Sequence, residues 1–248
     1  MTYELDKKFW TSYLDIVEHI DFEYKKLQCS FSQLYWTRLV YKLFGKFINF
    51  DYSPSKAVSF NQIFYHKNLL KNMVIFWLLN TELGALPDSI IDVGCGAAPS
   101  TLAYIKVKSI SNSICTNIKW IDQSKYQLGI ARAFIGDLYT PDISCRKVTF
   151  DEKFYYEDLV VLSYVLCEQP KTIKNLCNNI NNFLKGIIVI DYRINIDKMR
   201  KYLSGKGQLL HWNVTVELPK DIIKLVGEQY VQISGCYFKS KATSKCSG

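Results

Sequence analysis

Apolar residues recur at intervals of three and four through the first third of the chain. This spacing predicts an amphipathic helix over residues 3–27 and a second helix from about residue 30 to residue 47. A third helix is predicted over residues 59–83, and its second half is strongly apolar. Turn-forming residues at 49–55 predict a loop before this third helix.

From Ser89 the pattern changes to short apolar runs that alternate with helical stretches. Predicted strands are 89–93, 114–121, 146–150, one within 158–170, 187–191, 209–218 and 230–240, and predicted helices are 100–106, 126–135, 172–184 and 196–203. Strands that alternate with helices indicate an α/β domain built on a parallel sheet. The last two strands alternate apolar and polar positions, which is typical of strands with one exposed face.

The segment Ile90–Leu102 reads as a buried strand, a glycine turn and the start of a helix. Gly94 and Gly96 lack a Cβ atom, so they permit unusual dihedral angles and a close approach of a ligand to the backbone. Pro99 suits the first turn of a helix, where its missing N–H costs nothing. Asp92 ends the strand, on the side where open α/β sheets bind ligands. The segment therefore predicts a site for a nucleotide-like ligand.

The D-x-G-x-G pattern of residues 92–96 resembles the first motif of class I S-adenosylmethionine-dependent methyltransferases. The resemblance extends over residues 89–240. It implies a Rossmann-like α/β fold with a seven-stranded, mostly parallel sheet in the order 3-2-1-4-5-7-6, preceded here by an N-terminal helical extension. It also implies S-adenosyl-L-methionine as the cofactor, with its amino-acid end bound by Asp92, Gly94, Cys95 and Gly96.

Asp122 ends the second strand of this unit, where an acidic side chain can accept hydrogen bonds from both hydroxyls of a ribose. Asp122, Gln123 and Ser124 together resemble the D-x-S form of the second family motif, so Asp122 and Gln123 are expected at the cofactor. Ser124 is also placed to cap the next helix, and the two roles are compatible. By the same resemblance, Asp151 is expected near the adenine amino group, although it could equally be a turn residue.

Residues 158–166, Asp-Leu-Val-Val-Leu-Ser-Tyr-Val-Leu, resemble the fourth family motif. Their nearly continuous apolar character indicates a strand buried on both faces, as the centre of a parallel sheet requires. The resemblance implies that Ser163 and Tyr164 lie beside the reactive methyl group of the cofactor.

Methyl transfer needs no strong catalytic signature, because the cofactor supplies the reactivity and the protein supplies geometry, desolvation and sometimes a base. We expect the base or acceptor-orienting group among Glu168, just beyond the fourth strand, His66 and Tyr164, with Tyr192 and His211 as further candidates. Histidine has an ordinary pKa near 6.5, which suits general base catalysis when its position allows. From the helical region, Tyr52, Asn61, Tyr65 and His66 are candidates to face the substrate.

The chain has 31 basic and 23 acidic residues, a net charge of +8, without a dense Arg/Lys stripe. It also lacks the N/D-P-P-Y sequence of nucleic-acid amino methyltransferases and the Pro-Cys nucleophile of enzymes that methylate a pyrimidine carbon. A small molecule or a protein or peptide side chain is therefore favoured as acceptor over a nucleobase. The eight cysteines form no C-x-x-C pair, so no metal site is expected and free thiols are favoured over disulfides. The absence of a signal peptide and of a bilayer-spanning apolar run predicts a cytoplasmic protein.

We expect residues 1–86 to form a helical extension that covers the ligand cleft, residues 87–240 to form the methyltransferase domain, and residues 241–248 to form a flexible basic tail. Two alternatives stay open. The G-x-G-A-x-P-x-T-L sequence of residues 94–102 also resembles nicotianamine-synthase-like enzymes, which transfer the aminocarboxypropyl group of the same cofactor. The domain could also be a non-catalytic module of this fold that binds protein or ribosomal RNA.

Overall fold

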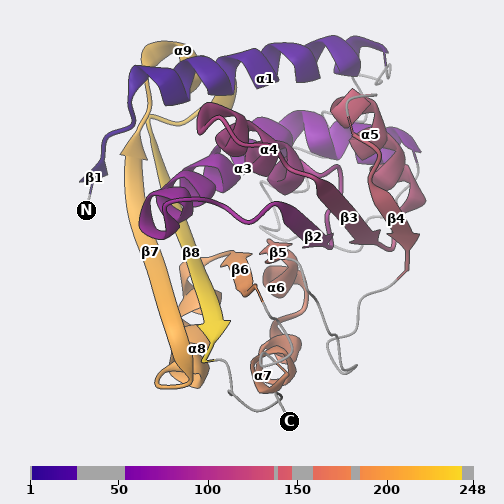
Figure 1. The fold of residues 1–248 in the computed structure, drawn as a ribbon. Coiled ribbons are helices and arrows are strands. Elements are labelled where there is room, and N and C mark those ends of the chain that lie inside the picture. The colour runs from indigo at the N-terminus through magenta and orange to yellow at the C-terminus, as the bar shows by residue number, and fades with distance from the viewer. Residues whose placement is uncertain (1, 27–53, 137–138, 147–158, 180–184, 242–248) are drawn as a thin grey trace.

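The computed structural model describes residues 2–26, 54–136, 139–146, 159–179 and 185–241. They form one eight-stranded sheet with helices on both of its faces (Figure 1). In spatial order the strands are β1 (Thr2–Tyr3), β7 (Gly207–Glu217), β8 (Tyr230–Ser240), β6 (Ile187–Ile190), β5 (Leu159–Ser163), β2 (Ser89–Val93), β3 (Asn117–Asp122) and β4 (Asp142–Cys145).

Read from β4 to β7, this order is the predicted 3-2-1-4-5-7-6 arrangement, so the predicted fold class is confirmed. The neighbours from β4 to β6 pair in parallel, while β8 runs antiparallel to both β6 and β7. The two-residue strand β1 adds a parallel edge beside β7 that the sequence pattern did not predict. This eighth strand is too short to produce an alternating pattern.

Alternate residues of the central strands belong to two separate hydrophobic clusters, one on each face of the sheet. One face is covered by α1 (Lys7–Lys26), α3 (Pro54–Leu83), α4 (Pro99–Ile110), α5 (Lys125–Ile135) and α9 (Lys220–Val226). The other face is covered by α6 (Val165–Glu168), α7 (Ile173–Asn178) and α8 (Arg193–Leu203), and the 3₁₀ turn η2 (Pro170–Thr172) lies between α6 and α7 along the chain. The carboxyl ends of the parallel strands therefore lie between two helical layers.

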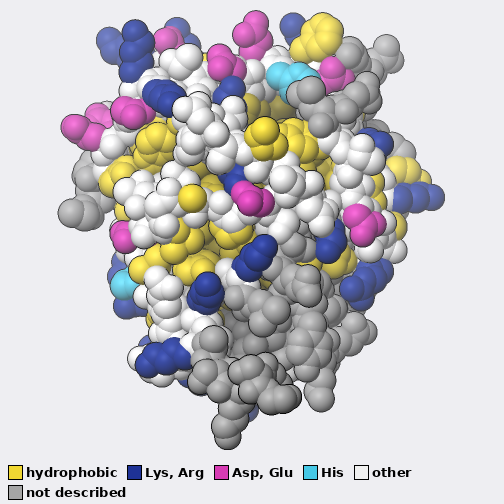
Figure 2. Space-filling model, in the orientation of Figure 1, with side chains coloured by type: hydrophobic (Ala, Val, Ile, Leu, Met, Phe, Trp, Pro, Cys, Tyr) yellow, Lys and Arg dark blue, Asp and Glu magenta, His cyan; other side chains and the backbone are white. Residues whose placement is uncertain are grey.

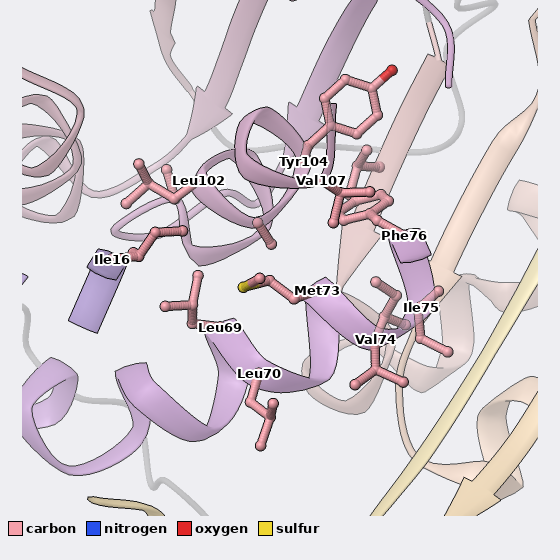
Figure 3. Packing of buried hydrophobic residues seen from close by; sticks show 14 of the residues in the cluster. Ile16, Leu69, Leu70, Met73, Val74, Ile75, Phe76, Leu102, Tyr104 and Val107 are labelled. Atoms are coloured by element: carbon pink, nitrogen blue, oxygen red, sulfur yellow. The ribbon is translucent and has the colours of Figure 1, made fainter. Parts of the chain in front are cut away.

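Helix α3 is the centre of the larger cluster. Its Leu69, Met73 and Phe76 side chains point toward Ile16 of α1 and toward Leu102, Tyr104 and Val107 of α4, while Leu70, Val74 and Ile75 point away from α4 (Figure 3). Leu69, Leu70, Met73, Val74, Ile75 and Phe76 are fully buried. A helix that is apolar on all sides is buried on all sides, which explains why this segment shows no single hydrophobic stripe.

The structure has a strand just before the third predicted one. It places β4 at Asp142–Cys145, paired with Lys119–Asp122 of β3, whereas the predicted strand 146–150 lies, beyond Arg146, outside the described residues. This edge strand is largely exposed, so its residues give no hydrophobic signal, whereas the apolar residues that follow it do. The predicted helix over residues 30–47 and the segment 147–158 lie outside the described residues.

Lys108 of α4 is a buried cation with only 1% of its side chain exposed. Its Nζ atom donates to the carbonyl oxygens of Leu86 and Pro87, at 3.1 and 3.0 Å, and to Asp88 Oδ1 at 2.8 Å. These three bonds satisfy the ammonium completely and tie the segment before β2 to α4. None of the described helices contains an apolar stretch that could cross a bilayer.

Candidate functional site

A pocket opens where β2, β3 and β5 end. Its volume of about 140 Å³ is roughly ten times what one water molecule needs, so it has room for a ligand. It is lined by Asn61, Tyr65, Asn68, Gly94, Cys95, Gly96, Ala97, Pro99, Ser100, Asp122, Gln123, Gln127, Ser163, Tyr164, Val165, Glu168 and Gln169. Of the nine residues expected at a cofactor, the structure brings seven together here; Asp92 does not line the pocket, and Asp151 lies outside the described residues.

The turn after β2 has a left-handed backbone at three positions, Gly94 (φ 68°), Gly96 (φ 54°) and Ala98 (φ 58°). A Cβ atom at Gly94 would lie 2.6 Å from Cγ2 of Val165, so glycine is required there both by conformation and by space. Pro99 is the first residue of α4, as predicted. The turn thus lies directly against the start of α6 and leaves its backbone facing the pocket.

Asp122, the last residue of β3, is hydrogen-bonded to this turn. Its Oδ2 atom accepts a hydrogen bond from the N–H of Gly96 at 2.9 Å, and its Oδ1 atom accepts one from the N–H of Ser124 at 2.7 Å. Burial raises the pKa of the Asp122 carboxyl, and the two N–H donors oppose that rise. Ser124 caps α5 by accepting from the N–H of Gln127 at 3.2 Å, so its predicted capping role is confirmed.

Asp92 faces α4 and does not line the pocket. Its Oδ2 atom accepts hydrogen bonds from the hydroxyls of Ser100 and Thr101, at 2.5 and 2.7 Å, and its Oδ1 atom has no hydrogen-bond partner among the described residues. Burial raises the pKa of Asp92 to about 6, against the effect of the two hydroxyl donors. The cofactor contact expected of Asp92 stays a prediction, while its bonds to α4 give it a clear structural role.

Beyond β5 the chain turns sharply at Tyr164, which has a left-handed backbone (φ 59°) and occupies the N-cap position of α6. Its ring packs edge-on against Tyr192, with centroids 5.8 Å apart, and Lys71 Nζ of α3 lies 5.2 Å from the ring centre. The neighbouring Ser163 hydroxyl is buried without a hydrogen-bond partner among the described residues. Ser163 and Tyr164 therefore form the wall of the pocket at the end of β5.

Glu168, at the end of α6, lies at the mouth of the pocket and remains exposed. Partial burial of its carboxyl, together with the nearby charges of Asp122 and Asp191, raises the pKa of Glu168 to about 6. Such a carboxylate is ionised at neutral pH and still a better proton acceptor than an ordinary glutamate.

The other catalytic candidates lie elsewhere. His66 Nε2 pairs with Asp21 Oδ1 of α1 at 3.0 Å, does not line the pocket, and burial lowers its pKa. Tyr192 packs against the ring of Tyr164 but does not line the pocket, and His211 lies on β7 away from the lining residues. Asp151 and Tyr52 lie outside the described residues. Among the described residues, Glu168 and Tyr164 are the catalytic candidates that line the pocket.

Helix α3 supplies one wall of the pocket. Asn61 Nδ2 donates to Gln127 Oε1 of α5 at 2.6 Å, and the hydroxyl of Tyr65 donates to the carbonyl of Ala97 at 3.1 Å. Asn61 and Tyr65 were candidates from the sequence, whereas Asn68 and Gln127 were not. A polar side chain on the buried side of an apolar helix is the signal that could have found them.

Among the described residues, no group of three or more His, Cys, Asp or Glu side chains is placed to hold a metal ion. No protein-family model matches the chain, and no curated protein sequence matches it.

Solved structures do match. A protein from Methanococcus maripaludis, assigned as an S-adenosyl-L-methionine-dependent methyltransferase, superposes with a TM-score of 0.52 at 13% identity, over 80% of this chain and 99% of its own. The plantazolicin methyltransferase BamL, solved with S-adenosylhomocysteine and a triazolic desmethylplantazolicin analogue, gives a TM-score of 0.50 at 14% identity, over 77% and 93%. The fold is that of the class I methyltransferases. The resemblance in the sequence motifs and the strand order of the sheet therefore agree, and at these identities the likeness establishes the fold alone.

Proposed function

We propose that the chain is an S-adenosylmethionine-dependent methyltransferase that acts on a small molecule or on a protein or peptide side chain. The observation that carries this proposal is the meeting of the left-handed glycine turn, the Asp122 carboxylate and the end of β5 in one pocket. This is the place where open α/β sheets bind nucleotide-like ligands. The bound S-adenosylhomocysteine of BamL supports the choice of cofactor.

In this proposal the backbone of Gly94 and Gly96 holds the amino-acid end of the cofactor. Asp122 accepts hydrogen bonds from the ribose hydroxyls on the lone pairs that the N–H groups of Gly96 and Ser124 leave free. Cys95 and Gln123 complete this part of the lining. Asp151 stays the expected partner of the adenine amino group.

The bound cofactor supplies an activated methyl group, and the protein supplies orientation and a proton acceptor. Ser163 and Tyr164 form the wall at the reacting end, and Glu168 is the proposed base because its carboxylate lies at the same end. Lys, Arg, Asp and Glu side chains are interspersed on the face shown in Figure 2, without a continuous basic surface among its described residues. This distribution supports a small or peptide acceptor over a nucleic acid.

Calorimetric titration with S-adenosylhomocysteine tests the proposal. We expect micromolar binding by the native chain and at least a tenfold loss for Asp122→Ala, with no change for the surface variant Asp197→Ala on α8. Circular dichroism would check that the variants are folded. Unchanged affinity in Asp122→Ala would overturn the proposed site.

The products formed from S-adenosylmethionine separate the alternatives. S-adenosylhomocysteine is expected for methyl transfer, whereas methylthioadenosine would indicate aminocarboxypropyl transfer. Failure to bind either nucleoside, together with salt-sensitive RNA binding, would indicate a non-catalytic module.

A further inference from the structure

The charged side chains that line the described part of the pocket are all negative. Among the described residues that line it, the charged side chains are Asp122 and Glu168, and both are carboxylates. The whole chain has a net charge of +8, so this lining departs from the average of the molecule. If Asp122 serves the ribose, as proposed above, then Glu168 is the charge available to the acceptor.

We propose that the acceptor is an amine, bound as an ammonium ion against Glu168 and Tyr164 and methylated on its nitrogen. This inference rests on the proposed function and specifies the substrate class of the same pocket. A carboxylate beside an aromatic side chain is the combination that recognises an ammonium group. An acceptor with a phosphate or carboxylate at this end would meet two like charges and no cationic side chain among the described lining residues.

The aromatic side chain is held in place from two sides. Lys71 of α3 and Tyr192 before α8 both contact the ring of Tyr164, and the backbone N–H of Tyr164 donates to the carbonyl of Ile190 at 2.7 Å. Lys71 does not line the pocket, so its charge does not contact the acceptor directly. Burial and the neighbouring Lys67 lower the pKa of Lys71 to about 8, so Lys71 stays mostly protonated at neutral pH, with its charge over the ring of Tyr164.

The buried carboxylate of Asp191 adds to the negative potential around Glu168. Asp191, at the end of β6, accepts hydrogen bonds from the N–H groups of Tyr192 and Cys167, at 2.7 and 3.1 Å, and from Asn195 Nδ2 at 2.8 Å. Asp191 does not line the pocket, so it does not itself contact the methyl acceptor. Its charge nevertheless helps to raise the pKa of Glu168, and it favours a cation at the same place.

The reaction balances with the groups named. The ammonium gives one proton to the Glu168 carboxylate and becomes a neutral amine. A bond then forms between the amine nitrogen and the methyl carbon, and the carbon–sulfur bond breaks with its electron pair remaining on sulfur. The sulfonium becomes a thioether and the product becomes a methylammonium ion. Glu168 passes its proton to water, because it is exposed at the mouth of the pocket.

Matched probes of opposite charge test the inference. The full chain saturated with S-adenosylhomocysteine would be titrated with butylammonium and 2-phenylethylammonium, and with the carboxylates and alcohols of the same size. We expect each ammonium to bind at least fivefold more tightly than its alcohol and the carboxylates not to bind. Glu168→Gln should remove the preference while the affinity for S-adenosylhomocysteine changes less than twofold.

Glu228→Gln is the control, because Glu228 pairs with Lys67 and does not line the pocket. It should keep the preference for ammonium. The inference is overturned if no ammonium probe binds, if carboxylates or alcohols bind as tightly, or if Glu168→Gln keeps the preference. Since S-adenosylhomocysteine binding is measured first, its absence would overturn the proposed function as well, whereas normal binding without a charge preference overturns the amine assignment alone.

Discussion

At the scale of single residues, Asp92 shows how a buried carboxylate can hold a helix. The N-cap position of α4 is Ala98, whose side chain cannot cap the helix, and Asp92 of the adjacent strand accepts hydrogen bonds from the hydroxyls of Ser100 and Thr101. Thr101 in turn accepts from the indole N–H of the buried Trp120 at 3.0 Å. The second oxygen of Asp92 lacks a hydrogen-bond partner among the described residues, so its negative charge is only partly compensated.

This arrangement predicts a pH-dependent stability. The pKa of Asp92 is raised from 3.8 to about 6 in the folded chain, so the folded state binds a proton more tightly than the unfolded state. The contribution of Asp92 to stability is therefore greatest below pH 4 and declines by at most about 3 kcal/mol as the pH rises through 6. Urea unfolding between pH 4 and pH 7 would measure the decline.

The variant Asp92→Asn should lose this part of the pH dependence, because an amide does not titrate. Asp221→Asn, which alters an exposed side chain of α9, should retain it. Equal pH profiles for Asp92→Asn and the native chain would contradict the assignment.

Gly94 leads to a second prediction at this scale. Gly94→Ala should cost a left-handed strain of about 1–2 kcal/mol and a further 1–3 kcal/mol for the overlap with Val165. Gly84→Ala has the same kind of backbone (φ 76°) and open space around it, so it should show the strain alone. Urea unfolding would measure both variants, and adding Val165→Ala should recover part of the loss in Gly94→Ala. Equal losses at the two glycines would contradict the close contact.

At the scale of elements, α3 connects the hydrophobic core to the pocket. Its second half packs in the core, and its first half places Asn61, Tyr65 and Asn68 along the pocket wall. The hydroxyl of Tyr65 binds the carbonyl of Ala97 within the glycine turn. The position of α3 should therefore influence how well the turn holds a ligand.

Two matched tyrosines test this connection. Tyr65→Phe and Tyr13→Phe each remove one hydroxyl bonded to a backbone carbonyl, so each should cost about 1 kcal/mol of stability. The bond of Tyr13 joins α1 to His66 and does not reach the turn. Only Tyr65→Phe should weaken S-adenosylhomocysteine binding, by roughly threefold to tenfold in calorimetric titration. Equal affinities for the two variants would show that the position of α3 does not influence ligand binding at the turn.

The elements also show which parts of the fold could be predicted from the sequence. Buried strands and long helices were predictable because they are rich in apolar residues, as in residues 89–93 and in the second half of residues 59–83. The exposed strand β4 and the one-turn helix α6 were not, because an exposed edge has no apolar pattern and a single turn has no period.

The site was predictable where a motif names its residues, as at Gly94 and Asp122. The inward turn of Asp92 and the contribution of Gln127 depend on how helices pack, which no spacing along the chain records. The negative charge of the pocket lining likewise could not be predicted, because it depends on which residues of three strand ends and of α3 meet in the fold.

At the scale of the whole molecule, α1, α3 and one face of the sheet share a single hydrophobic cluster. A shared core predicts one cooperative unfolding transition, and not a separate transition for the helices before Ser89. Calorimetry on the full chain would test this. Saturation with S-adenosylhomocysteine at about 100 times its Kd should add about 2.7 kcal/mol and move the single transition upward by roughly 5–10 °C. Two resolved transitions would contradict the shared core.

Chemical labelling of Lys108 would measure how often this part of the fold opens. The Lys108 ammonium is enclosed by the carbonyls of Leu86 and Pro87 and by Asp88, so an amine-reactive reagent cannot reach it while α4 stays packed. The exposed Lys224 provides an internal reference for the same reagent. Mass spectrometry of a timed labelling reaction would then report how often the seam between α4 and the segment before β2 separates, and whether a bound nucleoside slows that separation.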